Sequence, residues 1–311
     1  MAKKAYRVRN WSEYNKALTQ RGSITFWINE KTSKKWHGVG TTKQVRGRPK
    51  IYSELAIETC STMRVLFGLT FRRCQGFVKS LFEIMKLNIN PPSYTQICRR
   101  QKNLKIKLKH NVSGSIHVVV DATGLKIFGE GEWKVRQHGY SKRRMWRKLH
   151  VGVDVKTREI VMSELTDNHT GENKLLKPLL DQYTDGLIKV GADKGYDSYE
   201  CHEIIGRRDA ESAILLQRKS KIKKHLSKDG PPLVRDEITR RMRKVGRKQW
   251  KQEVGYHQRS LVENTFFRFK TILGGKLRSI ILENQKIEVL IGCNILNKFT
   301  QLGMPISVLA E

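Results

Sequence analysis

Cysteines, acidic residues and long apolar runs are all scarce in this chain of 311 residues. Its five cysteines are odd in number and scattered, and none form a CxxC pair, so we expect neither a disulfide framework nor a zinc site. Reduced core thiols of this kind fit a cytoplasmic protein. The longest apolar stretches, such as residues 287–296, run to about ten residues and are too short to cross a bilayer. The first nine residues carry charge without a following apolar segment, which excludes a signal peptide.

The shortage of acids leaves the chain strongly basic. Its 29 Asp and Glu residues stand against 61 Lys and Arg residues, a formal net charge of +32, and the pI is near 10.2. Hydrophobic residues make up 38% of the chain, enough for a real core, which excludes a disordered basic tail. The length is about twice that of a typical domain, so two domains are expected. A basic protein of this kind is expected to bind nucleic acid.

The few acids are unevenly distributed. Residues 1–110 have a net charge of +19 (24 basic and 5 acidic), residues 111–220 only +2 (18 and 16), and residues 221–311 +11 (19 and 8). More than half of the acids, 16 of 29, therefore lie between two basic flanks, unlike the uniform coating of a simple nucleic-acid packaging protein. Carboxylates in a region that must approach phosphates need a reason, and bound metal ions supply one.

Residues 1–50 are basic and polar, and we interpret them as a poorly packed arm and linker in which residues 24–28 are a candidate strand. Near their end, Arg46-Gly47-Arg48-Pro49 resembles the core of an AT-hook, where arginines enter a narrow minor groove. An ordinary basic linker fits the same four residues. Arg46 and Arg48 are therefore candidate DNA contacts if the flanking residues support a hook.

Residues 51–110 follow with a helical pattern. Apolar residues at a spacing of three to four predict three short helices. These helices begin at Ser53, Thr70 and Ser93, the last with a capping-box sequence. The third helix is basic, which favours a small helix-turn-helix-like DNA-binding domain with Arg99 and Arg100 in the major groove. A helical packing domain with solvated arginines is the alternative.

Residues 111–311 are predicted to form one α/β domain, with a basic interval at 218–251 that would follow the DNA backbone. In chain order, the expected strands are 115–120, 149–153, 160–165, 187–192 and 213–216, and the expected helices are 172–183, 199–207 and 260–273. The order β-β-β-α-β-α-β-α is that of the ribonuclease H-like fold, a mixed five-stranded sheet with helices.

Two acids end strands of this predicted sheet. Asp121 closes the first strand and Asp193 closes the fourth, and in a ribonuclease H-like sheet those strands are central neighbours. Ligands of such sheets bind at the carboxyl ends of the strands. We therefore expect the two carboxylates to converge.

A third acid comes from the last predicted helix. At about 100° per residue, Tyr256, Arg259, Glu263 and Lys270 fall on a stripe about 60° wide and share one face. Taken alone, an arginine four residues before a glutamate indicates a solvated ion pair. The interpretation changes if this face contacts the two acids of the sheet.

The same spacing matches the Y-x2-R-x3-E-x6-K signature of bacterial insertion-sequence transposases with a DDE active site. Residues 121–139 and 146–150 resemble the region around the first acid in the insertion-sequence-five family, specifically its 903 branch, and residues 193–197 resemble its second-acid motif. The likeness extends from Gly47-Arg48-Pro49 to residues 302–305, nearly the whole chain.

This resemblance implies a DDE transposase, an enzyme that cuts DNA at the ends of an insertion sequence and joins the 3′-hydroxyl ends to target DNA. Its catalytic triad would be Asp121, Asp193 and Glu263. These acids would hold two Mg²⁺ ions, with Mn²⁺ as a substitute, that activate the nucleophile and stabilise the leaving oxygen. Asp121 would bridge the two ions.

The remaining candidates are DNA contacts. Arg259 and Lys270 would hold phosphates, and Tyr256 would position DNA or Glu263. Trp133 and Lys134 lie in a basic loop, where base stacking and ordinary packing fit equally well.

Two further residues have simpler interpretations. Asp197 is expected to be a turn or helix-cap residue, and His150 a structural histidine.

The expected partner is double-stranded DNA, both terminal inverted repeats and target, without a membrane. Joining two DNA ends implies a homo-oligomer, at least a dimer, in the active complex, working in the bacterial cytoplasm at the nucleoid. The alternatives are a ribonuclease H-like nuclease without strand transfer and a non-catalytic DNA-binding protein derived from a transposase. A general RNA-binding protein is a further rival that would not need the acids.

Overall fold

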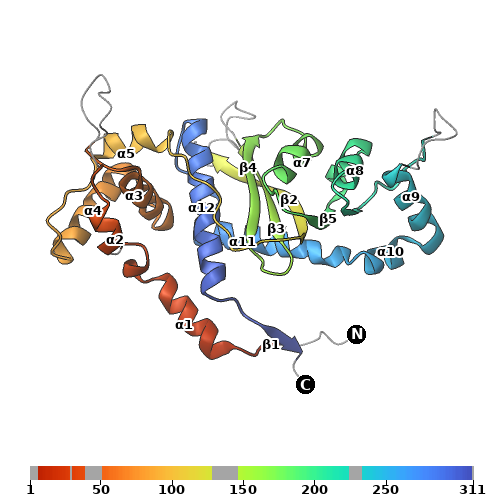
Figure 1. Ribbon diagram of the computed structural model, residues 1–311, viewed down its shortest axis with the longest axis horizontal. Coiled ribbons are helices and arrows are strands. Elements are labelled where there is room, and N and C mark those ends of the chain that lie inside the picture. Colours follow the sequence, from red (N-terminus) through yellow and green to blue (C-terminus); the bar gives the residue numbers. More distant parts are fainter. Residues whose placement is uncertain (1–5, 29, 39–50, 128–145, 224–232, 310–311) are drawn as a thin grey trace, which may run out of the picture. The chain divides into compact units, whose positions relative to one another are not determined.

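The computed structural model describes residues 6–28, 30–38, 51–127, 146–223 and 233–309 (Figure 1). These residues form two compact units. The first unit contains the described residues up to Lys107, the short stretch Ile272–Gly274, and those from Arg278 onward. The second contains Leu108–Thr271 and Gly275–Leu277. None of the helices in the described ranges is long and apolar enough to cross a membrane.

Helices dominate the first unit, and the three predicted ones are confirmed. Ser53 and Thr70 cap their helices by accepting backbone N–H groups, and Ser93 forms a full capping box with Gln96. The helices of this unit are α1 (Trp11–Arg21), α2 (Glu30–Lys34), α3 (Glu54–Leu66), α4 (Phe71–Ile84), α5 (Tyr94–Gln101) and α12 (Leu282–Leu302), with a short pair of strands β1 (Tyr6–Val8) and β8 (Ser307–Leu309).

The described part of residues 1–50 differs from the poorly packed arm that its composition suggested. Trp36 is fully buried and packs edge-on against Phe82, with ring centroids 4.9 Å apart. Ile28 belongs to the same core. Residues 24–26 form a 3-10 turn (η1, Ile24–Phe26) and not a strand. Aromatic residues placed among the lysines supply the buried apolar surface that the average composition concealed.

Helix α12 groups with the amino-terminal helices, whereas the sequence assigned residues 111–311 to one domain. Ile291, Ile295 and Phe299 form a stripe along α12 that packs against Val65 of α3. A buried ion pair joins the same two helices, with Arg64 Nη1 3.3 Å from Glu288 Oε2. The stripe buries apolar surface against α3, and this burial accounts for the placement of α12 in the first unit.

The second unit is an α/β structure in which the predicted order of strands and helices is confirmed. Its mixed sheet runs β4-β3-β2-β5-β6, with β2 antiparallel to β3 and parallel to β5, and β7 pairs with the end of β2. Its elements are β2 (Ile116–Ile127), β3 (Trp146–Asp154), β4 (Ile160–Asp167), α7 (Glu172–Leu180), β5 (Leu187–Ala192), α8 (Tyr199–Gly206), β6 (Glu211–Ile214), α9 (Val234–Val245), α10 (Arg247–Glu253), α11 (Ser260–Ile272) and β7 (Lys276–Leu277).

The alternation of β2 assigns the two faces of this sheet. Val118 and Val120 join a core with Leu176 of α7 and Cys201 of α8. The alternate residues, such as Val119 and Thr123, point to the opposite face, where Lys270 of α11 donates to Thr123 Oγ1. Asp121 belongs to this second set.

The described part of the basic interval 218–251 contains two helices that the sequence pattern did not reveal. Met242 of α9 and Trp250 of α10 are buried and pack with Leu216, which follows β6. The interval is therefore partly a folded element of the second unit, with its basic side chains on a helical scaffold.

Candidate active site

Asp121 and Asp193 occupy matching places on neighbouring parallel strands. The pairing of β2 with β5 ends with Val120 opposite Ala192, so the two aspartates immediately follow the last pair. The sequence suggested that Asp121 closes its strand. In the structure, β2 continues to Ile127 because β3 pairs with it further along, so Asp121 lies within the strand. In two parallel paired strands, residues at matching positions lie side by side. The two aspartates therefore lie close together at the carboxyl end of β5.

Backbone groups hold both carboxylates. Asp121 Oδ1 accepts the N–H of Ala122 at 2.8 Å. Asp193 caps a 3-10 turn (η2, Lys194–Tyr196), and its Oδ1 accepts the N–H of Gly195 at 2.7 Å. These local bonds orient the side chains without neutralising their charge.

Arg259 joins Asp121 to Glu263. Its Nη1 donates to Asp121 Oδ2 at 2.6 Å, and its Nη2 donates to Glu263 Oε1. Glu263 lies in the first turn of α11, with 54% of its side chain exposed. A single guanidinium therefore spans from the sheet to α11, and Glu263 points toward the edge that carries Asp121.

The four signature residues, Tyr256, Arg259, Glu263 and Lys270, do not lie on one regular helix. Tyr256–Arg259 form a 3-10 turn (η3) before α11 begins at Ser260, so a constant rotation of about 100° per residue does not apply across them. Lys270 still reaches β2, where its Nζ donates to Thr123 Oγ1 at 2.7 Å. Tyr256 packs beside Trp250, with ring centroids 6.4 Å apart.

Burial raises the pKa of Asp121 to about 6, and the charges of Asp193 and Glu172 act in the same direction. The Ala122 N–H and the Arg259 guanidinium oppose this rise but do not cancel it. Burial also raises the pKa of the Tyr196 hydroxyl, again with contributions from Glu172, Asp121 and Asp193. The three carboxylates therefore form one group with an excess of negative charge.

Glu172 is the member of this group that sequence reasoning missed. It is the first residue of α7, and Lys148 Nζ lies 3.8 Å from its Oε1. Its Oε2 lies so close to Gly195 that a Cβ at that position would collide with it, and the same Cβ would lie 2.9 Å from Asp193 Oδ1. A signal was present in the sequence: Glu172 follows strand β4, which runs parallel to β2 and ends at the same edge as Asp121.

Asp197 is the C-cap residue of the 3-10 turn η2, as the sequence suggested, and its buried side chain is in addition a charge centre. Arg235 donates to both of its oxygens, from Nε at 2.7 Å and from Nη2 at 3.1 Å, and the Gln217 N–H donates at 2.8 Å. His202 Nε2 lies 3.4 Å from Asp197 Oδ1. Burial acts to raise the pKa of Asp197, but these hydrogen bonds bring it well below its usual range.

Of the other predicted residues, the structure describes Arg99 and Arg100, which belong to the first unit. On α5, Arg99 is exposed, whereas Arg100 is half-buried and donates to the Tyr52 carbonyl at 2.7 Å. The remaining candidates, Arg46, Arg48, Trp133 and Lys134, lie outside the described residues.

His150 is fully buried, with its Nε2 3.1 Å from Thr166 Oγ1. Burial and the nearby Lys148 lower the pKa of His150 to about 4, so it is neutral at pH 7. This fits the interpretation of a structural histidine.

The donor set suits a hard metal ion, although no three His, Cys, Asp or Glu side chains of the described ranges are already arranged around one. Carboxylate oxygens without thiols or imidazoles favour Mg²⁺, Ca²⁺ or Mn²⁺. The pKa of Asp121 is raised mainly by burial, and the charges of Asp193 and Glu172 add to this rise. In the present arrangement, Arg259 supplies the cation between Asp121 and Glu263.

Two family models match this chain. A family model described as a transposase DDE domain matches residues 113–298, which is more than half of the chain, and another model with the same description matches residues 19–130. Among solved structures, the chain is similar to a piggyBac transposase synaptic complex with hairpin DNA, with a TM-score of 0.41 and 10% identity over 97% of this chain and 78% of that one. It is also similar to a Drosophila P element transposase strand transfer complex, with a TM-score of 0.32 and 12% identity over 81% and 66%.

Proposed function

This chain belongs to the transposases that carry a DDE domain, and we propose that it cuts DNA at the ends of an insertion sequence and joins the freed 3′-hydroxyl ends to target DNA. It is therefore an enzyme, a DNA transposase. The observation that carries the proposed reaction is the Arg259 guanidinium that links Glu263 to Asp121, at the point where Asp193 follows the last pair of β2 and β5. We place it in the insertion-sequence-five family, 903 branch, on the resemblance of residues 121–139 and 146–150 to the region around that family's first acid.

We assign the second unit to the ribonuclease H-like fold. An antiparallel run of β2, β3 and β4 is followed by α7, and β5 then returns to pair in parallel with β2. This topology brings residues from distant parts of the chain to one edge, which is what a site built from Asp121, Asp193 and Glu263 requires.

Asp121, Asp193 and Glu263 would hold two divalent cations, Mg²⁺ or its substitute Mn²⁺. Such ions activate the nucleophile and stabilise the leaving oxygen of a phosphodiester. The DDE transposases generally use divalent metal ions, and the oxygen-only donor set fits them. Asp121 must lose its proton to act as a ligand, and we assign it the role of the ligand shared by both cations.

The basic side chains would then serve the DNA. With Asp121 and Glu263 holding the cations, Arg259 would be free to hold a phosphate by two hydrogen bonds from its planar guanidinium. Lys270 would supply a point charge further along β2. Half-buried Tyr256, which packs beside Trp250, would position DNA or Glu263.

The first unit is proposed to bind DNA, with Arg99 of α5 as a contact in a helix-turn-helix-like arrangement. Arg100 is a weaker candidate because its guanidinium already bonds to the Tyr52 carbonyl. The partners would be inverted repeats and target DNA, and the joining of two ends requires at least a dimer. The site of action would be the bacterial cytoplasm, at the nucleoid.

The experiment that tests this function is a strand-transfer assay with precleaved ends of the element that encodes the chain. We expect joined products in Mg²⁺ or Mn²⁺ and none in chelator. Asp121→Asn, Asp193→Asn and Glu263→Gln should each abolish joining. Glu211→Gln is the matched control, since Glu211 lies at the start of β6, at the opposite edge of the sheet, paired with Lys189.

The same assay separates the rival functions. Cleavage without joined product would favour a nuclease, and unchanged biological activity in the three acid variants would favour a non-catalytic DNA-binding protein. Binding of RNA without any preference for element ends would favour a general RNA-binding protein and contradict the proposal.

A further inference from the structure

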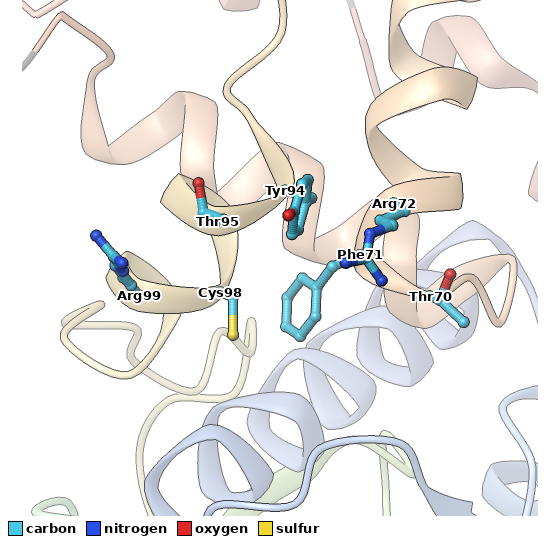
Figure 2. Close-up of a pocket in the computed structure, with 7 residues that line it drawn as sticks. All are labelled: Thr70, Phe71, Arg72, Tyr94, Thr95, Cys98 and Arg99. Atoms are coloured by element: carbon cyan, nitrogen blue, oxygen red, sulfur yellow. The ribbon is translucent and has the colours of Figure 1, made fainter.

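A hollow of about 460 Å³ opens in the first unit between the starts of α4 and α5 (Figure 2). Its volume falls in the range of about 300 to 1,000 Å³ that is typical of small-ligand sites. Figure 2 shows the Phe71 ring projecting from α4 toward Cys98 of α5, with Tyr94 beside it. We call this site the Phe71 hollow and define it by Phe71, Arg72, Tyr94, Cys98 and Arg99.

The two helix starts that form the hollow are held together. The Tyr94 N–H donates to Gln75 Oε1 of α4 at 2.8 Å. The caps at Thr70 and Ser93 fix the first turns of α4 and α5. The hollow therefore exists before any ligand arrives, and binding would not require the helices to be ordered first.

Aromatic rings and cations alternate around the hollow. The Arg64 guanidinium lies 4.2 Å from the centroid of the Phe71 ring, and Arg64 is itself held in its buried pair with Glu288. The Arg72 guanidinium lies 4.6 Å from the Tyr94 ring, which is 37% exposed. Arg99 is exposed at the side of the hollow that α5 forms. The lining is thus planar and apolar, with positive charge at its rim.

We propose that the Phe71 hollow binds one unpaired nucleotide of DNA, with the base against Phe71 and Tyr94 and the adjoining phosphates on Arg72 and Arg99. The proposal deepens the proposed function, on which it rests for the choice of DNA as the ligand. A phosphate alone would seek polar donors, whereas the exposed surface of this lining is mainly apolar, even though Thr70 and Thr95 also belong to it. A base within an intact duplex hides its faces in the stack, so only an unpaired base can use them.

The rim decides between a nucleotide and an apolar side chain of another protein. A site for an apolar side chain gains nothing from two arginines, since their charges would remain solvated at its edge. A nucleotide combines a flat apolar base with an anion at each end, which matches rings flanked by Arg72 and Arg99. The strongly basic first third of the chain adds to the same attraction.

The test uses the full chain carrying Asp121→Asn, so that DNA is bound and not cut. Fluorescence anisotropy compares two duplexes of the same arbitrary sequence, one fully paired and the other with a single bulged nucleotide. We expect the bulged duplex to bind about tenfold more tightly, since base stacking on aromatic side chains is worth roughly that factor or more. Removing the base from the bulged nucleotide should abolish the preference.

Variants of the hollow sharpen this test. Tyr94→Leu and Phe71→Leu keep apolar bulk, and each should reduce the preference for the bulge to about twofold or less. Arg72→Ala and Arg99→Ala should weaken binding of the bulged duplex more than binding of the paired one. Arg73→Ala is the matched control, because Arg73 is the exposed neighbour of Arg72 and does not line the hollow. It should weaken both duplexes equally.

A bulge carrying the fluorescent base 2-aminopurine reports the contact directly. Its emission should fall when the protein binds, because the base stacks on a ring, and the fall should vanish in Tyr94→Leu. Equal binding of paired, bulged and abasic duplexes would overturn the proposal, as would a preference that survives both ring variants. Because the assay needs no catalysis, a failure of strand transfer with an intact bulge preference would reject the proposed reaction and leave the hollow's ligand in place.

Discussion

Asp193 and Asp197 are four residues apart in the chain, yet they belong to two regions with opposite electrostatics. Asp193 lies at what we call the acidic edge, defined by Asp121, Asp193, Glu172 and Glu263. There, burial and neighbouring charges raise the pKa of Asp121 to about 6. Asp197 lies in a buried pair with Arg235, and its hydrogen bonds hold its pKa well below the usual range.

The difference lies in the supply of donors. Asp197 receives the Arg235 guanidinium and the Gln217 N–H, so its charge is matched inside the protein. The acidic edge has Arg259 and Lys148 against four carboxylates. Matched charge serves the fold, whereas unmatched charge is the state expected of a site that awaits a cation.

The largest expected effect follows from removing a carboxylate of the acidic edge. Asp121→Asn should lower strand cutting and joining by about a thousandfold or more, since the lost ligand supports charge stabilisation worth several kcal/mol. The folded state should be as stable as the wild type or more so, because a poorly compensated charge is removed. Single-turnover kinetics and urea unfolding measure the two quantities. A variant with wild-type rates in Mg²⁺ would remove Asp121 from the mechanism.

The buried pair should respond in the opposite way. Asp197→Asn leaves the Arg235 guanidinium without its partner, and we expect the free energy of unfolding to fall by about 3 kcal/mol. Asp181→Asn is the control, because its pair with Arg208 is exposed and should contribute less than about 1 kcal/mol. Equal losses in the two variants would mean that burial of the Asp197 pair has no energetic consequence.

The pH dependence of stability should separate the two regions without metal. The folded pKa of Asp121, about 6, lies above its ordinary value of 3.8, so the folded state binds the proton more tightly and loses stability as pH rises between these values. Asp197 has a depressed pKa, so its contribution is present above about pH 4 and is lost as pH falls further.

Urea unfolding in chelator from pH 2 to 7 measures this contrast. Relative to the wild type, Asp121→Asn should gain stability as pH rises through that interval. The loss of unfolding free energy caused by Asp197→Asn, relative to the wild type, should be smallest at the lowest pH. If the unfolding free energies of the wild type and Asp121→Asn changed in parallel with pH, the folded protein would not shift the pKa of Asp121.

Local patterns predicted much of this arrangement. The span of β5, the caps at Ser53 and Ser93, and the acids after adjacent strands all follow from neighbouring residues, because strand alternation and capping are local effects. The sequence does signal that Glu172 follows a strand parallel to β2, but its close approach to Gly195 depends on how α7 packs, which no local pattern encodes. Helix α12 was not predicted. Its apolar stripe packs against α3, which is distant in sequence, so its place in the first unit does not follow from neighbouring residues.

Arg259 illustrates the intermediate case. Its spacing from Glu263 predicted an ion pair, and that pair is present. The second bond, to Asp121, depends on the contact between α11 and β2, and it converts a common surface pair into a link between two elements. The spacing therefore predicted the pair with Glu263, four residues away, but not the pair with Asp121 on β2.

The smallest expected effect comes from a single methyl group at the acidic edge. In Gly195→Ala the new Cβ would collide with the Glu172 carboxylate and lie 2.9 Å from Asp193 Oδ1. Because the Glu172 side chain is flexible at its end, we expect stability to change by less than about 1 kcal/mol and activity to fall roughly tenfold through displaced carboxylates. Gly76→Ala is the control, since its Cβ would have no neighbour within 4 Å. Recovery of activity in Gly195→Ala with Glu172→Ala would assign the loss to crowding, whereas a further loss would make Glu172 itself a required carboxylate of the acidic edge.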